Sequence, residues 1–176
     1  PNDSVDLVIT SPPYAGAQKY VRASSLSLGW LGYCEDRNLR DYEKKSIGRE
    51  HYHKEEYQEL AVSGVNEADG LLRSIWKENP LRAHINSNYI SEMRLAIREI
   101  FRVLKRGSYF LLVIANNRVC GSDFYTQDYV SEVAEQEGFK VVVRLVDDIR
   151  SRGLMTKRNK TAGLINSEWV VVLEKP

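Results

Sequence analysis

Near its start the chain reads Val5-Asp6-Leu7-Val8-Ile9-Thr10-Ser11-Pro12-Pro13-Tyr14. The first part is an apolar, β-rich run of the kind that forms a buried strand in a parallel sheet, so we expect a strand over residues 5–10. The two prolines end this strand, because each fixes its own φ and restricts the residue before it. Residues 11–14 are therefore predicted to form a stiff loop past the carboxyl end of a strand, where open α/β sheets bind ligands.

Helices and strands are predicted to alternate in the second half of the chain. Apolar residues recur at helical spacing over 89–105, and a continuous apolar run follows over 109–115. A second helix is predicted over 125–136, followed by strands over 139–146 and 168–174. This order indicates an α/β fold with a mostly parallel sheet, helices on both faces, and strand 5–10 beside strand 109–115 in parallel.

Further signals add expectations about individual residues and strands. Gly107 is predicted to follow the end of the first helix, and Thr126 to cap the second. Asn116-Asn117 forms a polar pair at the carboxyl end of strand 109–115. Strand 5–10 is expected to leave an apolar edge exposed.

The composition indicates one packed domain. The chain has 176 residues, is 43% hydrophobic and has a net charge of +1, so nucleic-acid binding would depend on local basic patches. Cys34 and Cys120 lie far apart in the sequence and form no metal motif, which favours a reduced, cytoplasmic protein. We see no apolar run long enough to cross a membrane and no signal peptide.

Residues 15–88 are the least regular part of the sequence. Short helices are predicted over 39–45 and 55–62, and aromatic residues alternate with charged ones, which makes this region a candidate DNA-facing surface. The alternative, which we expect for most of these aromatics, is packing on the rest of the domain. His51 and His53 flank Tyr52, and a solvated pair is favoured over a metal site because no Cys or carboxylate follows at ligand spacing.

The loop Ser11-Pro12-Pro13-Tyr14, preceded by Thr10, resembles the catalytic motif of the S-adenosylmethionine-dependent DNA amino-methyltransferases. The form Thr-Ser-Pro-Pro-Tyr is typical of the cytosine-N4 enzymes of that family. The predicted order of elements is similar to the C-terminal half of the family's Rossmann-like sheet, in which the last strand enters antiparallel. The segment Val103-Leu104-Lys105-Arg106-Gly107 also resembles the helix-to-strand turn before the family's fifth strand.

This resemblance implies a domain organisation, a cofactor and partners. Residues 1–176 would form a single, partial methyltransferase catalytic domain, with residues 15–88 as an insertion. The cofactor would be S-adenosylmethionine and the substrate double-stranded DNA. The usual setting of the family, restriction–modification, implies a cognate restriction nuclease as a further partner.

The resemblance also implies roles for the loop residues. An exocyclic amino nitrogen is a poor nucleophile, and acceptors for its hydrogens, here the Ser11 hydroxyl and the Pro12 carbonyl, favour the reactive pyramidal form. Tyr14 would stack on a flipped base, worth about 1–3 kcal/mol, and Pro13 would stiffen the loop. The ring is expected to do this work, so phenylalanine at position 14 would keep most activity. On these four residues alone, a plain Pro-Pro turn with Tyr14 in the core is an equal alternative.

The cofactor site is expected to be incomplete. Thr10 and Ser11 would form part of it, but the family's glycine-rich turn, Phe-x-Gly-x-Gly, is absent from this sequence. The chain is therefore expected to be a piece of a longer protein and to be inactive by itself.

A basic segment lies between the last two predicted strands. It contains five cations with no acidic residue between them, namely Arg150, Arg152, Lys157, Arg158 and Lys160. We expect it to contact DNA phosphates, with a merely solvated loop as the alternative.

Three other functions compete with cytosine-N4 methylation. Adenine-N6 methylation uses the same loop chemistry. Methylation of RNA or of a protein amide uses related loops, whose usual first residue is Asn rather than Ser. A non-catalytic nucleic-acid-binding domain with a degenerate fold is the third, and the intact Ser11–Tyr14 loop disfavours it.

Overall fold

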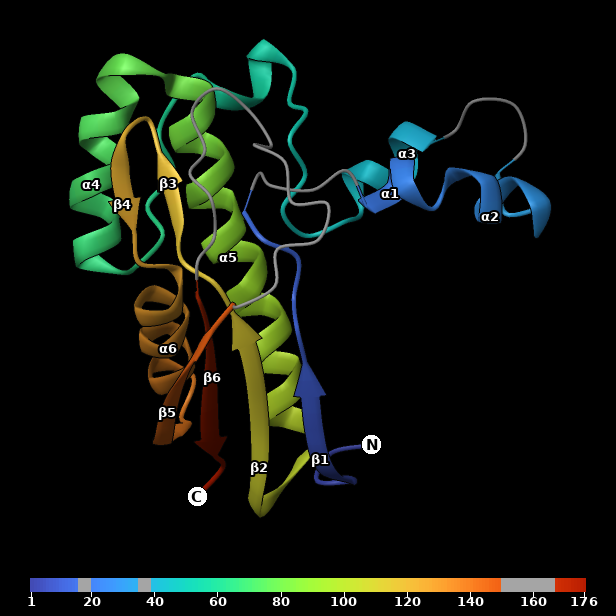
Figure 1. The fold of residues 1–176 in the computed structure, drawn as a ribbon, viewed down its shortest axis with the longest axis vertical. Helices are drawn as coiled ribbons and strands as arrows, with labels where there is room; N and C mark the ends of the chain where they lie inside the picture. The colour runs from blue at the N-terminus through green and yellow to red at the C-terminus, as the bar shows by residue number, and fades with distance from the viewer. Residues whose placement is uncertain (16–19, 35–38, 150–166) are drawn as a thin grey trace.

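The computed structural model describes residues 1–15, 20–34, 39–149 and 167–176. Its main sheet contains strands β1 (Val5–Thr10), β2 (Leu104–Ile114), β5 (Lys140–Asp148) and β6 (Ser167–Glu174), in the order β1-β2-β6-β5 (Figure 1). β1 pairs with β2 in parallel, whereas β6 is antiparallel to both of its neighbours. The predicted mostly parallel sheet, with its last strand reversed, is thus confirmed.

The remaining described elements are six helices, one short 3-10 helix and a hairpin. They are α1 (Tyr20–Ala23), α2 (Ser25–Trp30), α3 (Leu39–Lys44), η1 (Lys54–Tyr57), α4 (Asn66–Glu78), α5 (Pro80–Val103), β3 (Asn117–Val119), β4 (Ser122–Phe124) and α6 (Thr126–Gln136). Among these described elements, no helix has the length and apolar character needed to cross a membrane.

The helix α5 starts earlier than the predicted 89–105. The Asn79 side chain accepts a hydrogen bond from the Arg82 backbone N–H at 3.1 Å, which caps the helix. Pro80 occupies the first turn, where its missing N–H costs nothing. The sequence signal was weak because the first buried positions of this helix include polar residues such as His84 and Asn86.

Three other local predictions were wrong. Gly107 does not follow the helix end but lies inside β2 with φ +72°, where the pairing with β1 is irregular. Thr126 does not cap α6, because its hydroxyl donates to the Phe124 carbonyl instead. The helix predicted over 55–62 is only the 3-10 turn η1.

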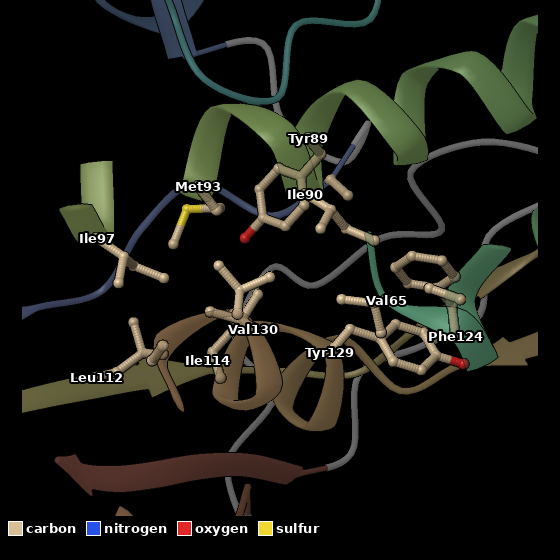
Figure 2. Packing of buried hydrophobic residues seen from close by; sticks show 14 of the residues in the cluster. Val65, Tyr89, Ile90, Met93, Ile97, Leu112, Ile114, Phe124, Tyr129 and Val130 are labelled. Atoms are coloured by element: carbon tan, nitrogen blue, oxygen red, sulfur yellow. The ribbon is translucent and has the colours of Figure 1, made fainter. Parts of the chain in front are cut away.

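The core lies between one face of the sheet and the helices α5 and α6 (Figure 2). Alternate residues of β2, namely Phe110, Leu112 and Ile114, are fully buried on this face. They meet Ile90, Met93 and Ile97 of α5 and Val130 of α6 within the same cluster. Each such side chain stabilises the fold by about 1.5–3 kcal/mol.

The other face of the sheet has no helix over it in the described ranges. Leu7, Ile9, Tyr109 and Leu145 share this face through the strand register and are 43–64% exposed. The prediction of helices on both faces is therefore wrong for the described part of the chain. β1 forms an edge of the sheet, so the expected exposed apolar edge is confirmed.

Lys175, near the C-terminus, links the C-terminal end of α5 to the N-terminal segment of the chain. Its buried ammonium donates to the carbonyls of Phe101 and Leu104 and to the Asp3 carboxylate, each at 2.7 Å. A cation here favours the negative C-terminus of the helix. The hydrogen bond from Lys175 to Asp3 lowers the pKa of the Asp3 carboxyl below its usual value.

Replacing Lys175 with Met tests this cap. The apolar stem is kept, but two buried carbonyls are deprived of their donor, so we expect a loss of about 1–3 kcal/mol in the free energy of unfolding measured in urea. Lys140→Met, at the exposed first residue of β5, is the matched control and should change stability by less than about 0.5 kcal/mol. Equal losses in the two variants would contradict the proposed cap.

Candidate active site

Three elements bring polar residues to one edge of the sheet. The carboxyl ends of β1 and β2 meet the amino end of β6 there, because β6 runs in the opposite direction. β1 leads into the loop Ser11–Tyr14, β2 into Asn116 and Asn117, and β6 begins with Ser167 and Glu168. The Ser11–Tyr14 loop, which the sequence predicts to be catalytic, therefore lies past the carboxyl ends of the parallel strands, where open α/β sheets bind ligands.

The Tyr14 hydroxyl is hydrogen-bonded to Glu168, at the start of β6. Its ring is half-buried, and its hydroxyl donates to the Glu168 carboxylate at 2.5 Å. Burial and then this carboxylate raise the pKa of Tyr14 well above its ordinary value, so the hydroxyl keeps its proton at neutral pH. The Ser11 side chain acts on the Tyr14 pKa in the opposite direction. The Tyr14 hydroxyl thus links the loop to the start of β6.

The asparagine pair after β2 serves two purposes. The Asn117 side chain donates to the Ala15 carbonyl at 3.1 Å and so holds the end of the catalytic loop. The Asn116 side chain accepts from the Gln127 backbone N–H at 3.1 Å, at the start of α6. Within the loop itself, Ser11 is exposed and Pro12 is buried.

The 15–88 region packs against the Ser11–Tyr14 loop at Gly48. This glycine has φ +75°, and a Cβ on it would lie 3.2 Å from the Tyr14 carbonyl oxygen and 3.4 Å from the Tyr89 ring. The Gly48 backbone N–H donates to the Glu92 carboxylate of α5 at 3.0 Å. A glycine at position 48 therefore allows a close approach of two backbones.

Tyr89 forms the buried floor beside this contact. It is fully buried, and its hydroxyl has no hydrogen-bond partner among the described residues. Burial raises the pKa of Tyr89, and the neighbouring Tyr20 and Tyr14 act in the same direction. Tyr89 is thus an uncharged packing partner of the loop.

A basic pocket of about 440 Å³ lies within the 15–88 region. Its wall includes Arg22, Leu39, Arg40, Glu43, Lys44, Arg49, His51, Tyr52 and His53. Arg49 is already engaged, because it pairs with Glu56 at 2.6 Å and lies 3.8 Å from the centre of the Tyr52 ring. Arg22, Arg40 and Lys44 are exposed and leave the pocket with an excess of positive charge.

The other candidate site residues fall into two groups. Thr10 is the last residue of β1 and is half-buried beside the loop. The basic residues Arg150, Arg152, Lys157, Arg158 and Lys160 lie outside the described residues. Across the part of the chain that is described, no group of three or more His, Cys, Asp or Glu side chains is placed to hold a metal ion.

Glu168 and Gly48 were not anticipated from the sequence. Glu168 is only an acidic residue at the start of an apolar strand, and it contacts a residue 154 positions away. Gly48 is one of several glycines in an irregular region. In each case the local sequence shows no sign of the distant partner.

The sheet order and the loop together define part of a methyltransferase-type Rossmann-like domain. Known proteins agree. The chain is 34% identical over 160 residues to the type II methyltransferase M.AvaI of Nostoc sp., and equally to that of Anabaena variabilis. It is 24% identical over 200 residues to the type II methyltransferase M.BsoBI of Geobacillus stearothermophilus. The chain is thus homologous to type II methyltransferases, and its resemblance to the DNA amino-methyltransferase family is confirmed.

These relatives are much longer than the matched region. The matches cover 82% of this chain but 33% of M.AvaI, and 99% of this chain but 39% of M.BsoBI. No protein-family model matches the chain.

One solved protein of Thermus thermophilus, assigned as a DNA modification methylase, matches the whole chain and 48% of its own length at 18% identity and a TM-score of 0.48. Its complex with S-adenosyl-L-methionine matches with 17% identity and a TM-score of 0.42, over 49% of that chain.

Gly48→Ala tests the close approach to the catalytic loop, with Gly64→Ala as its control. Both glycines have positive φ, so each substitution is expected to cost about 1–2 kcal/mol of backbone strain. Gly48→Ala should cost more, because its Cβ meets the Tyr14 backbone, whereas at Gly64 it meets only the flexible tip of Arg94 at 3.1 Å. Urea unfolding measures both effects, and equal values would contradict the close approach.

Proposed function

We propose that this chain is the catalytic part of a DNA methyltransferase that moves a methyl group from S-adenosylmethionine to the exocyclic N4 of cytosine. The observation that supports this most strongly is the Ser11-Pro12-Pro13-Tyr14 loop at the ligand-binding edge of the sheet, in a homologue of type II methyltransferases. Residues 1–176 act as one partial catalytic domain, and residues 15–88 are its insertion.

The chemistry follows from the loop. The Ser11 hydroxyl and the Pro12 carbonyl would each accept a hydrogen bond from the target amino group, which favours the pyramidal nitrogen whose lone pair is no longer delocalised into the ring. The Tyr14 ring offers a face for the base once it has left the duplex, and Pro13 keeps the loop stiff. Among the described residues the two cysteines are not involved: Cys120, for example, has its thiol pKa raised by burial, the opposite of an activated nucleophile.

The chain provides only part of a cofactor site. Thr10 is the last residue of β1 and Ser11 the first of the loop, and we assign both to part of the cofactor site. The glycine-rich turn that would hold the rest is absent from this sequence. S-adenosylmethionine provides the electrophilic methyl group, while the residues described here position the acceptor nitrogen.

Double-stranded DNA is the proposed partner, held at two basic regions. One is the pocket of the insertion, whose exposed cations suit backbone phosphates. The other is the segment with Arg150, Arg152, Lys157, Arg158 and Lys160. The type II relatives suggest a restriction nuclease as the biological counterpart.

Adenine N6 is the alternative target. The amino groups of adenine and cytosine have the same chemistry, so the loop geometry serves both. The serine in the first position of the motif favours cytosine, as the resemblance implies.

Mass spectrometry of nucleosides from methylated DNA tests the function. The assay uses this chain together with its cofactor-binding half, and N4-methylcytosine is the expected product. Ser11→Ala removes one acceptor and should lower turnover by roughly a hundredfold or more, and Tyr14→Ala should also lower it strongly. Cofactor binding should change far less. Formation of 5-methylcytosine, or full activity in Tyr14→Ala, would contradict the mechanism. Formation of N6-methyladenine would leave the mechanism intact and identify adenine as the target base.

The basic pocket is tested by replacing Arg22, Arg40 and Lys44 with Ala. DNA binding should weaken similarly for all sequences, and its dependence on salt should become shallower by about one in log–log slope for each phosphate that is no longer neutralised. Arg106 and Lys140 lie at the amino ends of β2 and β5, at the opposite edge of the sheet, and their double Ala variant is the control. An unchanged salt slope in the triple variant would remove the pocket from the DNA interface.

A further inference from the structure

We propose that Glu92 of α5 is a positioning residue that holds the basic pocket at a fixed place relative to the Ser11–Tyr14 loop. DNA that is bound by its backbone in the pocket would then present its target base to Tyr14. This inference rests on the proposed function and deepens it, because it assigns a residue outside the loop to the same reaction.

One oxygen of Glu92 holds the segment that touches the loop. Oε2 accepts the Gly48 backbone N–H at 3.0 Å. Gly48 in turn lies so close to Tyr14 that a Cβ on it would be 3.2 Å from the Tyr14 carbonyl oxygen. The carboxylate therefore fixes the point at which the 15–88 region meets the loop.

The other oxygen of Glu92 holds a wall of the basic pocket. Oε1 accepts the Asn88 side-chain amide at 2.7 Å, and the same amide nitrogen donates to the Tyr52 hydroxyl at 2.7 Å. Tyr52 lines the pocket, and the Arg49 guanidinium lies 3.8 Å from the centre of its ring. One carboxylate thus joins the loop contact and the pocket wall through two separate bonds.

The helix α5 provides a fixed reference for both contacts. Asn88 and Glu92 are one turn apart on this helix and so lie on the same side of it. Another side of α5 is buried in the core through Ile90 and Met93. Residues 49–53 belong to no helix or strand, so their side-chain contacts with α5 set their position.

The cations of the pocket depend on this anchorage. Arg22 lies in α1, while Arg40 and Lys44 lie in α3, and neither helix has a buried residue. Figure 1 shows both helices standing away from α5. Since α3 ends just before Gly48, the bond from Gly48 to α5 also places the cations of α3.

A carboxylate is the group that this place requires. Its two neighbours, the Gly48 N–H and the Asn88 amide, are both donors, and a carboxylate accepts with both of its oxygens. A glutamine has one oxygen and would turn its NH2 group toward one of the donors, so one of the two bonds would be lost. The packing of Tyr52 on His84, with ring centres 4.5 Å apart, would remain. The region would therefore stay folded but lose its fixed register with the loop.

The test compares Glu92→Gln with Glu99→Gln, in the chain together with its cofactor-binding half. We expect Glu92→Gln to lower kcat on duplex DNA roughly 10- to 100-fold, because a misplaced substrate reacts slowly. The Kd for DNA should stay within about twofold and the salt slope of binding should not change, because the pocket keeps its cations. Glu99 is exposed on the same helix and pairs with Arg102, so its variant is the control and should retain full turnover.

A second comparison separates positioning from folding. When Arg22, Arg40 and Lys44 are all replaced with Ala, the pocket no longer holds DNA. Glu92→Gln should then lower kcat/KM by less than about twofold further, because both changes disable the same contact. Tyr52→Phe breaks only the bond on the pocket side and keeps the ring, and it should lower kcat on its own.

The role of Glu92 is contradicted by an unchanged kcat in Glu92→Gln, by losses that multiply in the combined variant, or by an unchanged salt slope when the pocket cations are removed. If urea unfolding shows that Glu92→Gln is not folded in the assay, Tyr52→Phe decides, and a wild-type kcat in that variant contradicts the role. The wild-type protein tests the proposed function separately. If it forms no methylated amino base, the function fails, whereas an active wild type with an equally active Glu92→Gln contradicts only the role of Glu92.

Discussion

The contacts at both ends of the sheet depend on the direction of strand β6, which is antiparallel to its neighbours. Because β6 runs antiparallel between β2 and β5, its first residues lie at the edge where β1 and β2 end. Glu168 reaches Tyr14 there, while Lys175, just past the other end of the strand, reaches the end of α5. β6 and the residue after it thus link the Ser11–Tyr14 loop at one end of the sheet to the C-terminal end of α5 at the other.

The elements that could be predicted from the sequence are those with a local cause. Strand 5–10 and the Pro-Pro loop are determined by neighbouring residues, and so is the apolar run of β2. The Tyr14–Glu168 contact could not be predicted, because neither residue marks its partner across the sheet. Gly107 was misplaced since a glycine suits both a helix end and an irregular strand, and only the pairing with β1 decides between them.

The stability of the described chain comes mainly from one side of the sheet. The fully buried side chains Phe110, Leu112 and Ile114 all face α5 and α6, whereas Leu7 and Ile9 on the other side gain little from folding. The Ser11–Tyr14 loop lies beyond the ends of the strands. Besides its two prolines, the polar contacts of Tyr14 with Glu168 and of Ala15 with Asn117 hold it in place.

The ion pair between Lys175 and Asp3 has a consequence for the topology of the domain. It joins a residue near the beginning of the chain to one near its end at 2.7 Å, and Figure 1 shows both termini at the same end of the sheet. These two residues stand 172 positions apart in the sequence, so they become neighbours only through the order of the strands in the sheet. The pair therefore forms only when β1, β2 and β6 have all assembled, and its formation reports that the sheet is complete.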